Sequence, residues 1–344
     1  MVPTYGKKEK RLAVNLPEHF LVTGGAGFIG SYLVERLLAD GKAVTVIDDL
    51  STGSLDNLHT VISNPNLRVI ESKVSECRAL SEIVAESESI YHLAAAVGVE
   101  LVVNSPIRTI QTNLRETEVV LEAASRYGVP ILLTSTSEVY GKSQKPAFSE
   151  ADDLLIGPPH LGRWSYACSK LMDEFLAMAF VRERKLPVTI ARLFNTVGPR
   201  QTGKYGMVLP RFVAAAGAGQ PLKVYGDGSQ TRCFCYVSDT VEALLRLKRT
   251  SAAVGEVVNV GSEEQISVLD LAHRVVSLMN SSSSIELVPY EVALAAGFED
   301  MRNRRPLIEK LWRLTGFRPS HHLDEIIGLI AGQPIKKGAP QGAP

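Results

Sequence analysis

Short apolar segments alternate with longer amphipathic segments along the first half of the chain. The apolar segments cover residues 20–22, 43–47, 67–71, 89–95 and 129–134, and their lengths suit buried strands. Residues 79–86, 106–127 and 164–184 place apolar side chains at helical intervals. This alternation predicts an α/β fold with a doubly wound parallel sheet, whose ligands bind beyond the carboxyl ends of the strands.

A glycine-rich turn joins the first predicted strand to a helix that starts at Phe28. Gly24 and Gly27 have no side chains, so a pyrophosphate can approach the backbone there. The unpaired N–H groups at the helix N-terminus attract an anion, and Gly30 lets the helix pack closely on the strand. The turn therefore predicts a dinucleotide site.

The second predicted strand leads into Asp48, eighteen residues after Gly30, where an acid would bind the adenosine ribose. Asp48 and Asp49 would repel a 2′-phosphate, so we predict NAD rather than NADP. The alternative is an ordinary glycine-rich turn with Asp48 as a solvated loop acid. The predicted NAD site comprises Gly24, Gly27, Phe28, Ile29, Gly30, Asp48, Asp49, Ser51, Thr52, Gly53, Leu93, Ala94, Ala95, Tyr166 and Lys170.

Charge and cysteine content exclude several classes of function. Basic and acidic residues number 37 each among 344 residues, which argues against nucleic acid or an anionic membrane as a partner. No apolar run reaches the length of a membrane span, and the basic N-terminus lacks the apolar core of a secretory signal. The four cysteines have neither metal-ligand spacing nor disulfide density. We therefore expect no metal site, and reduced thiols in a cytoplasm.

The length of the chain predicts more than one structural unit. We expect an N-terminal extension over residues 1–18 and a Rossmann-type NAD-binding domain over 19–190. Residues 191–332 are expected to form mainly a smaller mixed α/β lobe, with some of the chain returning to the first domain. Residues 333–344 are rich in Gly, Pro and Lys and are expected to form a disordered tail.

A hydroxyl-rich segment, TSTSEVYG at residues 134–141, follows the fifth predicted strand, and Tyr166 and Lys170 lie one helical turn apart in 164–184. An ammonium at that spacing stabilises a phenolate and makes tyrosine a usable base toward a sugar hydroxyl. Such pairs also occur by chance on partly exposed amphipathic helices. Their combination with the nucleotide turn favours the catalytic interpretation.

These motifs together resemble the extended short-chain dehydrogenase/reductase family, in its nucleotide-sugar epimerase, dehydratase and decarboxylase branch. The resemblance extends from about residue 20 to residue 329. It is carried by TGGAGFIG, Asp48, HLAAA at 92–96, TSTSEVYG, YACSK, RLFNTVGPR at 192–200 and YGDGSQTRCFCYVSD at 225–239. It implies that the first domain binds NAD tightly and that the second binds a nucleoside diphosphate sugar such as a UDP-sugar. It also implies that helices 107–127 and 164–184 pair across a homodimer, although burial within the monomer would give them similar apolar stripes.

The resemblance also implies roles for individual residues. Tyr166 matches the base and Lys170 its partner, while Thr136 shares the reacting oxygen of the sugar. The residues implied to hold the nucleotide and its phosphates include Tyr225 at the base and two arginines, Arg232 and Arg304. The predicted substrate site comprises Thr136, Asn195, Arg200, Val208, Tyr225, Arg232 and Arg304.

The chain departs from the family pattern at two positions. Lys73 stands where relatives often have an acid that contacts the adenine. Leu307 follows Pro306 where relatives tend to have aspartate.

The residues after Thr136 distinguish reactions that all begin by oxidising C4 of the sugar. Dehydratases place Asp-Glu there, whereas this chain has Ser137 and Glu138, and serine is a poor acid for expelling hydroxide. Thr-Ser-Glu is similar to the UDP-glucuronate decarboxylases, in which the 4-ketone creates a β-keto acid that loses carbon dioxide. The predicted catalytic set is Tyr166, Lys170, Thr136, Glu138 and Ser137.

Three hypotheses for the function remain in order of preference. The first is a UDP-glucuronate decarboxylase. The second is a 4-epimerase of UDP-glucose, UDP-glucuronate or a UDP-N-acetylhexosamine. The third is a catalytically silent protein that binds NAD and a nucleotide sugar, and the intact set of Tyr166, Lys170 and Thr136 argues against it.

Overall fold

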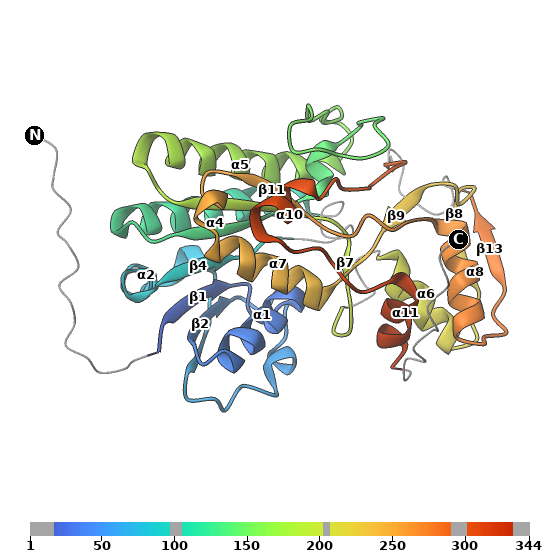
Figure 1. Cartoon of the computed structure of the whole chain (residues 1–344), viewed down its shortest axis with the longest axis horizontal. Helices are drawn as coiled ribbons and strands as arrows, with labels where there is room; N and C mark the ends of the chain where they lie inside the picture. Colours follow the sequence, from blue (N-terminus) through green and yellow to red (C-terminus); the bar gives the residue numbers. More distant parts are fainter. Residues whose placement is uncertain (1–16, 97–104, 202–206, 290–300, 333–344) are drawn as a thin grey trace, which may run out of the picture.

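The computed structural model describes residues 17–96, 105–201, 207–289 and 301–332. Most of the predicted N-terminal extension and all of the predicted tail lie outside these residues. A large lobe built on a central sheet lies beside a smaller lobe of short strands and helices (Figure 1). Within the described residues, no helix combines the length and apolarity that crossing a membrane requires, and no cluster of His, Cys, Asp and Glu could hold a metal.

The central sheet contains seven strands in the order β3-β2-β1-β4-β5-β6-β11, and all neighbours pair in parallel. The strand order reverses between β1 and β4, which opens a crevice at the carboxyl edge where such sheets bind dinucleotides. The predicted doubly wound fold is therefore confirmed. The strands are β1 (His19–Thr23), β2 (Ala43–Asp48), β3 (Leu67–Glu71), β4 (Ser89–His92), β5 (Ile131–Thr136), β6 (Val188–Leu193) and β11 (Val257–Val260).

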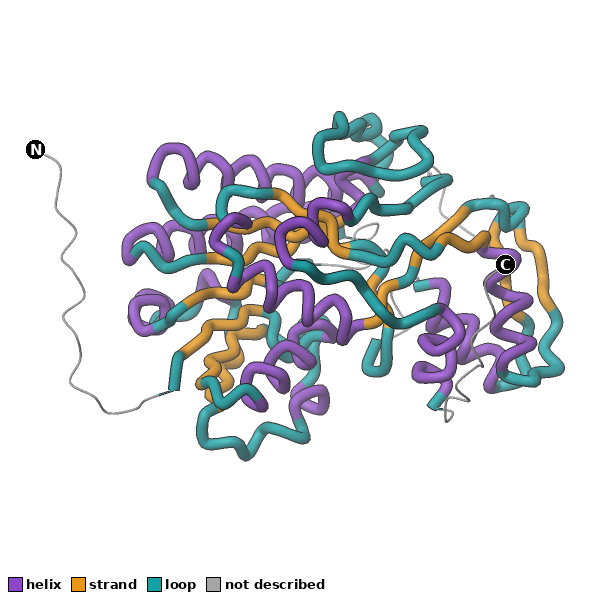
Figure 2. The backbone as a smooth tube through the Cα atoms, viewed as in Figure 1, coloured by secondary structure: helices purple, strands orange, loops and turns teal. Residues whose placement is uncertain are grey.

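Helices cover both faces of this sheet (Figure 2). Side chains alternate along a strand, so Phe20 and Val22 of β1 pack into the core on one face and Leu21 into the core on the other. One core includes α1 (Phe28–Ala39), α7 (Val237–Arg249) and α10 (Glu309–Thr315). The other includes α2 (Leu80–Glu86), α4 (Pro106–Tyr127) and α5 (Trp164–Arg184).

Two predicted strand boundaries were wrong. The fourth strand ends at His92 rather than at residue 95, because β1, its neighbour in the sheet, ends at Thr23. The fifth strand covers Ile131–Thr136 rather than 129–134, because the N–H of Val129 still bonds to the carbonyl of Ala124 at the end of α4. Thr136 is consequently the last residue of β5.

The described residues of the smaller lobe form paired short strands and helices. β7 (Thr196–Val197) pairs with β10 (Cys235–Tyr236), β8 (Leu222–Tyr225) with β13 (Ile285–Val288), and β9 (Thr231–Cys233) with β12 (Gln265–Ser267). An apolar core joins α6 (Val208–Gly217), α8 (Val268–Leu278) and α11 (Leu323–Ala331). Within the part of the chain that the structure describes, short 3-10 helices lie in loops: η1 (Leu55–Leu58), η2 (Val74–Glu76), η3 (Ser137–Tyr140) and η5 (Ser251–Ala253).

The chain crosses between the lobes more than once. β11 and α7 pack onto the central sheet although they follow strands of the smaller lobe in the sequence. The predicted domain boundary after residue 190 falls inside β6. The division into a cofactor domain and a substrate lobe stays a prediction.

Candidate active site

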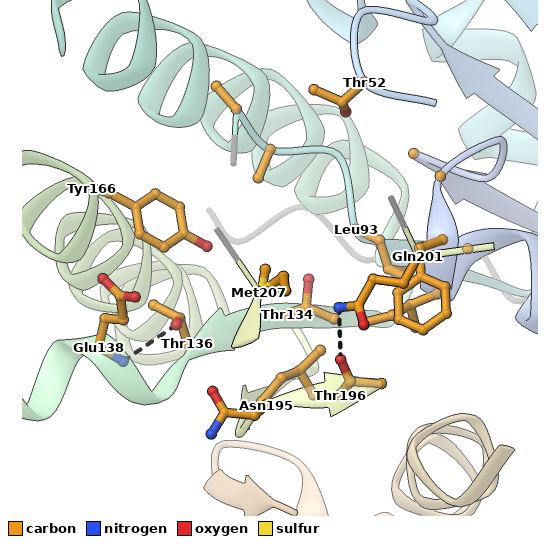
Figure 3. A pocket seen from close by; sticks show the side chains of 18 of the residues that line it. Thr52, Leu93, Thr134, Thr136, Glu138, Tyr166, Asn195, Thr196, Gln201 and Met207 are labelled. Carbon is orange, nitrogen blue, oxygen red and sulfur yellow. Dashed lines mark hydrogen bonds between the residues drawn. The ribbon is translucent and has the colours of Figure 1, made fainter. Parts of the chain in front are cut away.

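A cavity of about 680 Å³ extends from the carboxyl edge of the central sheet to the smaller lobe. Of the predicted site residues, all but Gly53 and Ser137 line it. Gly53 packs closely on Ala26, and Ser137 is fully buried behind the cavity wall. Figure 3 shows Tyr166, Glu138 and Thr136 together on one side of this cavity, with Thr52 and Leu93 apart from them at the cofactor end.

The glycine turn forms a cradle that an added Cβ atom would fill. A Cβ at Gly24, where φ is +72°, would lie 2.7 Å from the backbone nitrogen of Ala94, and one at Gly30 would lie 2.1 Å from the Gly24 carbonyl oxygen. α1 begins without a side-chain cap, so its first-turn N–H groups remain available to an anion. Phe28 and Ile29 of that turn line the cavity, and the site therefore fits a dinucleotide pyrophosphate.

Asp48 lies beside this cradle. Its two carboxylate oxygens accept hydrogen bonds from the backbone N–H groups of Ala26 and Leu50, both at 2.9 Å. Burial raises the pKa of Asp48, and these two hydrogen bonds oppose the shift. Asp49 and Lys73 also line this end, and the Lys73 ammonium lies 2.7 Å from Glu76. The two adjacent aspartates make the site a poor receptor for a 2′-phosphate.

Tyr166 and Lys170 extend from the first two turns of α5 and both line the cavity. Burial raises the pKa of Tyr166, and the charges of Glu138 and Asp173 raise it further, whereas Thr136 and Arg304 lower it. The sequence predicted that Lys170 would lower the pKa of Tyr166, but burial has the largest effect on that pKa and raises it. The Lys170 Nζ atom instead lies 2.9 Å from the Asp173 carboxylate.

Ser137 and Glu138 follow directly after β5 and both meet Arg304. The Arg304 Nη2 atom donates a hydrogen bond to the Ser137 hydroxyl at 2.7 Å, and its Nη1 atom lies 3.6 Å from the Glu138 carboxylate. The family resemblance implied that Arg304 binds the substrate phosphates. The structure places its guanidinium beside the Thr-Ser-Glu segment.

The smaller lobe forms the end of the cavity where the sequence predicts the nucleotide of the substrate. Arg232 donates hydrogen bonds to the carbonyls of Thr231 and Met301, at 2.8 and 3.0 Å. Tyr225 accepts a hydrogen bond from Arg211 at 2.7 Å, and the Arg211 guanidinium lies 4.9 Å from the centre of its ring. Two basic groups and an aromatic ring therefore lie together at this end of the cavity.

Two other predicted substrate residues already have partners in the protein. Asn195 donates a hydrogen bond to the carbonyl of Cys233 at 3.0 Å. Arg200 forms an ion pair with Glu35 of α1 at 2.8 Å and lies 4.4 Å over the ring of Tyr32. Arg200 thus joins the segment after β7 to the helix that begins at the glycine turn.

Several cavity residues were missed by the sequence analysis. Arg211 stands in the apolar run VLPRFV, and the charge within that run was the available signal. Gln230 follows the GDGS turn directly. The polar and charged residues missed include Asn57, Arg108, Thr112, Glu116, Arg163, Gln201, Arg211, Lys223 and Gln230.

Comparison with known proteins gives relatives along almost the whole chain. A UDP-N-acetyl-alpha-D-glucosaminuronate decarboxylase of Bacillus cytotoxicus is 42% identical over 301 residues, which are 87% of this chain and 92% of that protein. UDP-glucuronic acid decarboxylase 2 of Arabidopsis thaliana is 38% identical over 94% of this chain and 68% of its own length.

Among solved structures, the UDP-glucuronic acid 4-epimerase of Bacillus cereus, in complex with UDP-glucuronic acid and NAD, superposes with a TM-score of 0.81. It is 28% identical, and the match covers 91% of this chain and 98% of that one. The NAD dependent epimerase/dehydratase family matches residues 20–261, the segment from β1 through the end of β11 that contains the glycine turn, the Tyr/Lys pair and the Thr-Ser-Glu segment. The chain therefore belongs to the NAD dependent epimerase/dehydratase family.

Proposed function

We propose that this protein is an NAD-dependent decarboxylase of a UDP-uronic acid, with UDP-glucuronate as the first candidate substrate. The observation that carries the proposal is the contact of Arg304, which lines the same cavity as Tyr166 and Glu138, with Glu138 and with the buried Ser137 hydroxyl. Relatives named as decarboxylases of UDP-glucuronic acid and of its N-acetylated counterpart support it.

The proposed reaction begins at C4 of the sugar. Tyr166 accepts the proton of the C4 hydroxyl, and Thr136 orients the same oxygen. When bound, NAD would supply the hydride acceptor for C4 and, after decarboxylation, the hydride donor. Tyr166 then returns its proton to the C4 oxygen as the ketone is reduced. The C4 ketone is β to the C6 carboxylate. The C5–C6 bond therefore breaks, carbon dioxide leaves, and the electron pair of that bond passes into an enolate.

Arg304 is suited to the decarboxylation step because its guanidinium lies next to the Thr-Ser-Glu segment. A positive charge there binds the sugar carboxylate and stabilises the enolate that replaces it. The enolate must then gain one proton at C5. A water beside Glu138 supplies that proton, whereas the buried Ser137 accepts a hydrogen bond from Arg304.

A panel of UDP-sugars tests the proposal. The pure protein is incubated with UDP-glucuronate, UDP-N-acetylglucosaminuronate, UDP-glucose and UDP-N-acetylglucosamine, and the products are weighed by mass spectrometry. Loss of the mass of carbon dioxide from either uronate supports the proposal and identifies the substituent at C2. Tyr166→Phe serves as the control for the base and should abolish turnover.

A UDP-sugar 4-epimerase is the second candidate, because the UDP-glucuronic acid 4-epimerase of B. cereus has the same fold. An isomer of unchanged mass would favour it. Absence of turnover on the whole panel would favour a silent binding protein, against which the shared cavity of Thr136, Tyr166 and Lys170 argues.

We also propose that the protein is a homodimer. α4 and α5 pack against each other, and each carries exposed apolar side chains. These are Ile107, Ile110, Met172 and Phe175, which are 72%, 37%, 50% and 60% exposed. A second copy would bury them in a four-helix interface. Four cysteines without a disulfide support the further proposal of a cytoplasmic location.

A further inference from the structure

Lys170 has a buried acidic partner that the sequence analysis did not consider. The Lys170 Nζ atom lies 2.9 Å from Asp173 Oδ2, and the two side chains are only 3% and 0% exposed. Asp173 lies three residues after Lys170 on α5, so the same helix that presents Tyr166 also holds this pair. A buried ammonium with no counter-charge tends to release its proton.

Two other carboxylates near this pair have cationic partners of their own. Glu174 binds Arg192 at 2.7 Å, and Glu138 faces Arg304. Several elements contribute groups that interact with this pair or with Tyr166 through charge or hydrogen bonds. These groups are Glu174 of α5, Thr117 of α4, His92 of β4, Glu138 of η3, and Arg304. Among the described residues, Asp173 is therefore the carboxylate that contacts Lys170.

His92 does not compete for Asp173. Its two ring nitrogens lie 2.7 Å from the Thr23 hydroxyl and 3.2 Å from the Thr117 hydroxyl. Burial and then the charge of Lys170 lower the pKa of His92 to about 3, so the ring is neutral at physiological pH. Burial raises the pKa of Asp173, while Lys170 and the Thr117 hydroxyl lower it, so these two groups favour the ionised carboxylate.

We propose that Asp173 is a positioning residue that keeps Lys170 protonated beside Tyr166 and thereby sets the pH range in which the enzyme works. The proposal rests on the proposed function, because it assumes that Tyr166 is the base. Asp173 acts through Lys170 and has two opposing effects. It stabilises the ammonium, but its own negative charge also opposes the ionisation of Tyr166.

Asp173→Asn removes the charge and keeps the shape. Lys170 then releases its proton at lower pH, because its charge has no counter-ion. Tyr166 also ionises at lower pH for as long as Lys170 stays charged. Both limbs of the pH profile of kcat therefore move to lower pH, by about 1–3 pH units for a charge this close. A purely structural role would lower kcat without moving the limbs.

Nuclear magnetic resonance gives a readout that needs no sugar substrate. The full-length protein is labelled with 13C at the lysine Cε and the tyrosine Cζ, and titrated with and without NAD. The signal of Lys170 is the lysine signal that is missing in Lys170→Arg, and the signal of Tyr166 is the tyrosine signal that is missing in Tyr166→Phe. Because these titrations are independent of the sugar, the proposal can fail or succeed separately from the decarboxylase assignment.

Two control variants define the outcome. Glu174→Gln neutralises the adjacent buried acid, which binds Arg192, and should shift the titration midpoint of Lys170 by much less than Asp173→Asn does. Asp173→Glu keeps the charge and should restore most of the wild-type midpoint. An unchanged Lys170 midpoint in Asp173→Asn would overturn the proposal. If Asp173→Asn does not fold, Asp173→Ser takes its place, and an unchanged Lys170 midpoint in that variant would overturn the proposal equally.

Discussion

At the scale of single residues, the site depends on a few charges held in a largely buried setting. Arg304 faces Glu138, Arg192 binds Glu174, and Lys170 binds Asp173. The sequence identified Tyr166, Lys170 and Glu138 because each stands in a motif. It could not identify Asp173, because a pairing three residues along a helix becomes significant only when both side chains are known to be buried.

Glu138→Gln tests the step that follows oxidation. The amide keeps the size of the side chain but removes the charge that faces Arg304. We expect C4 oxidation to continue and product formation to slow by about 100-fold or more, so that a UDP-4-keto sugar accumulates in quenched samples. Glu116→Gln, a change at another glutamate of the cavity wall, should not cause accumulation. Normal product formation by Glu138→Gln would remove Glu138 from the mechanism.

His92 predicts a pH dependence of stability. Its pKa is about 3 in the folded protein and about 6.5 when unfolded, so between these values the unfolded chain binds more protons. Stability is therefore lost as the pH falls from about 6.5 toward 3, by up to about 1.4 kcal/mol per pH unit. Urea unfolding at pH 7 and pH 5 should show a smaller difference for His92→Gln than for the wild type. An equal difference in the two proteins would contradict the prediction.

At the scale of elements, periodicity predicted the long helices well and strand ends less well. α4 and α5 have the predicted bounds because their apolar side chains recur at helical intervals over many turns. The ends of β4 and β5 were wrong because they depend on the neighbouring strand and on the helix cap, which no local pattern records. The short paired strands of the smaller lobe were not predicted in detail either, since two- and three-residue strands have no measurable period.

Gly30→Ala tests the contact between α1 and the glycine turn. The new methyl group would lie 2.1 Å from the Gly24 carbonyl oxygen, and that backbone must move to admit it. We expect weaker NAD binding by calorimetry and a loss of stability of about 1–3 kcal/mol. Gly217→Ala is the matched control, since that helical glycine faces only the Met279 methyl at 3.6 Å. Equal NAD affinity in wild type and Gly30→Ala would contradict the assignment of the pyrophosphate site.

At the scale of the whole molecule, the cavity is formed by residues that are far apart in the sequence. Ser137 and Arg304 are hydrogen bonded although 167 positions separate them, and Arg200 meets Glu35 across 165 positions. Such contacts follow from the chain crossing between the lobes. The sequence could name the arginines as candidates, but their partners became visible only in the folded chain.

Phe175→Asp tests the proposed homodimer, because Phe175 is 60% exposed on α5 and would lie in the centre of a four-helix interface. A charge there should weaken the dimer by about 2 kcal/mol or more, which is at least about a 30-fold rise in Kd. Sedimentation at micromolar concentration measures the change. Leu287→Asp is the matched control, since Leu287 is 58% exposed on β13 of the smaller lobe, away from α4 and α5. A wild-type protein that sediments as a monomer, or a Phe175→Asp dimer of unchanged affinity, would contradict the interface and leave the apolar stripe of α4 and α5 without its proposed partner.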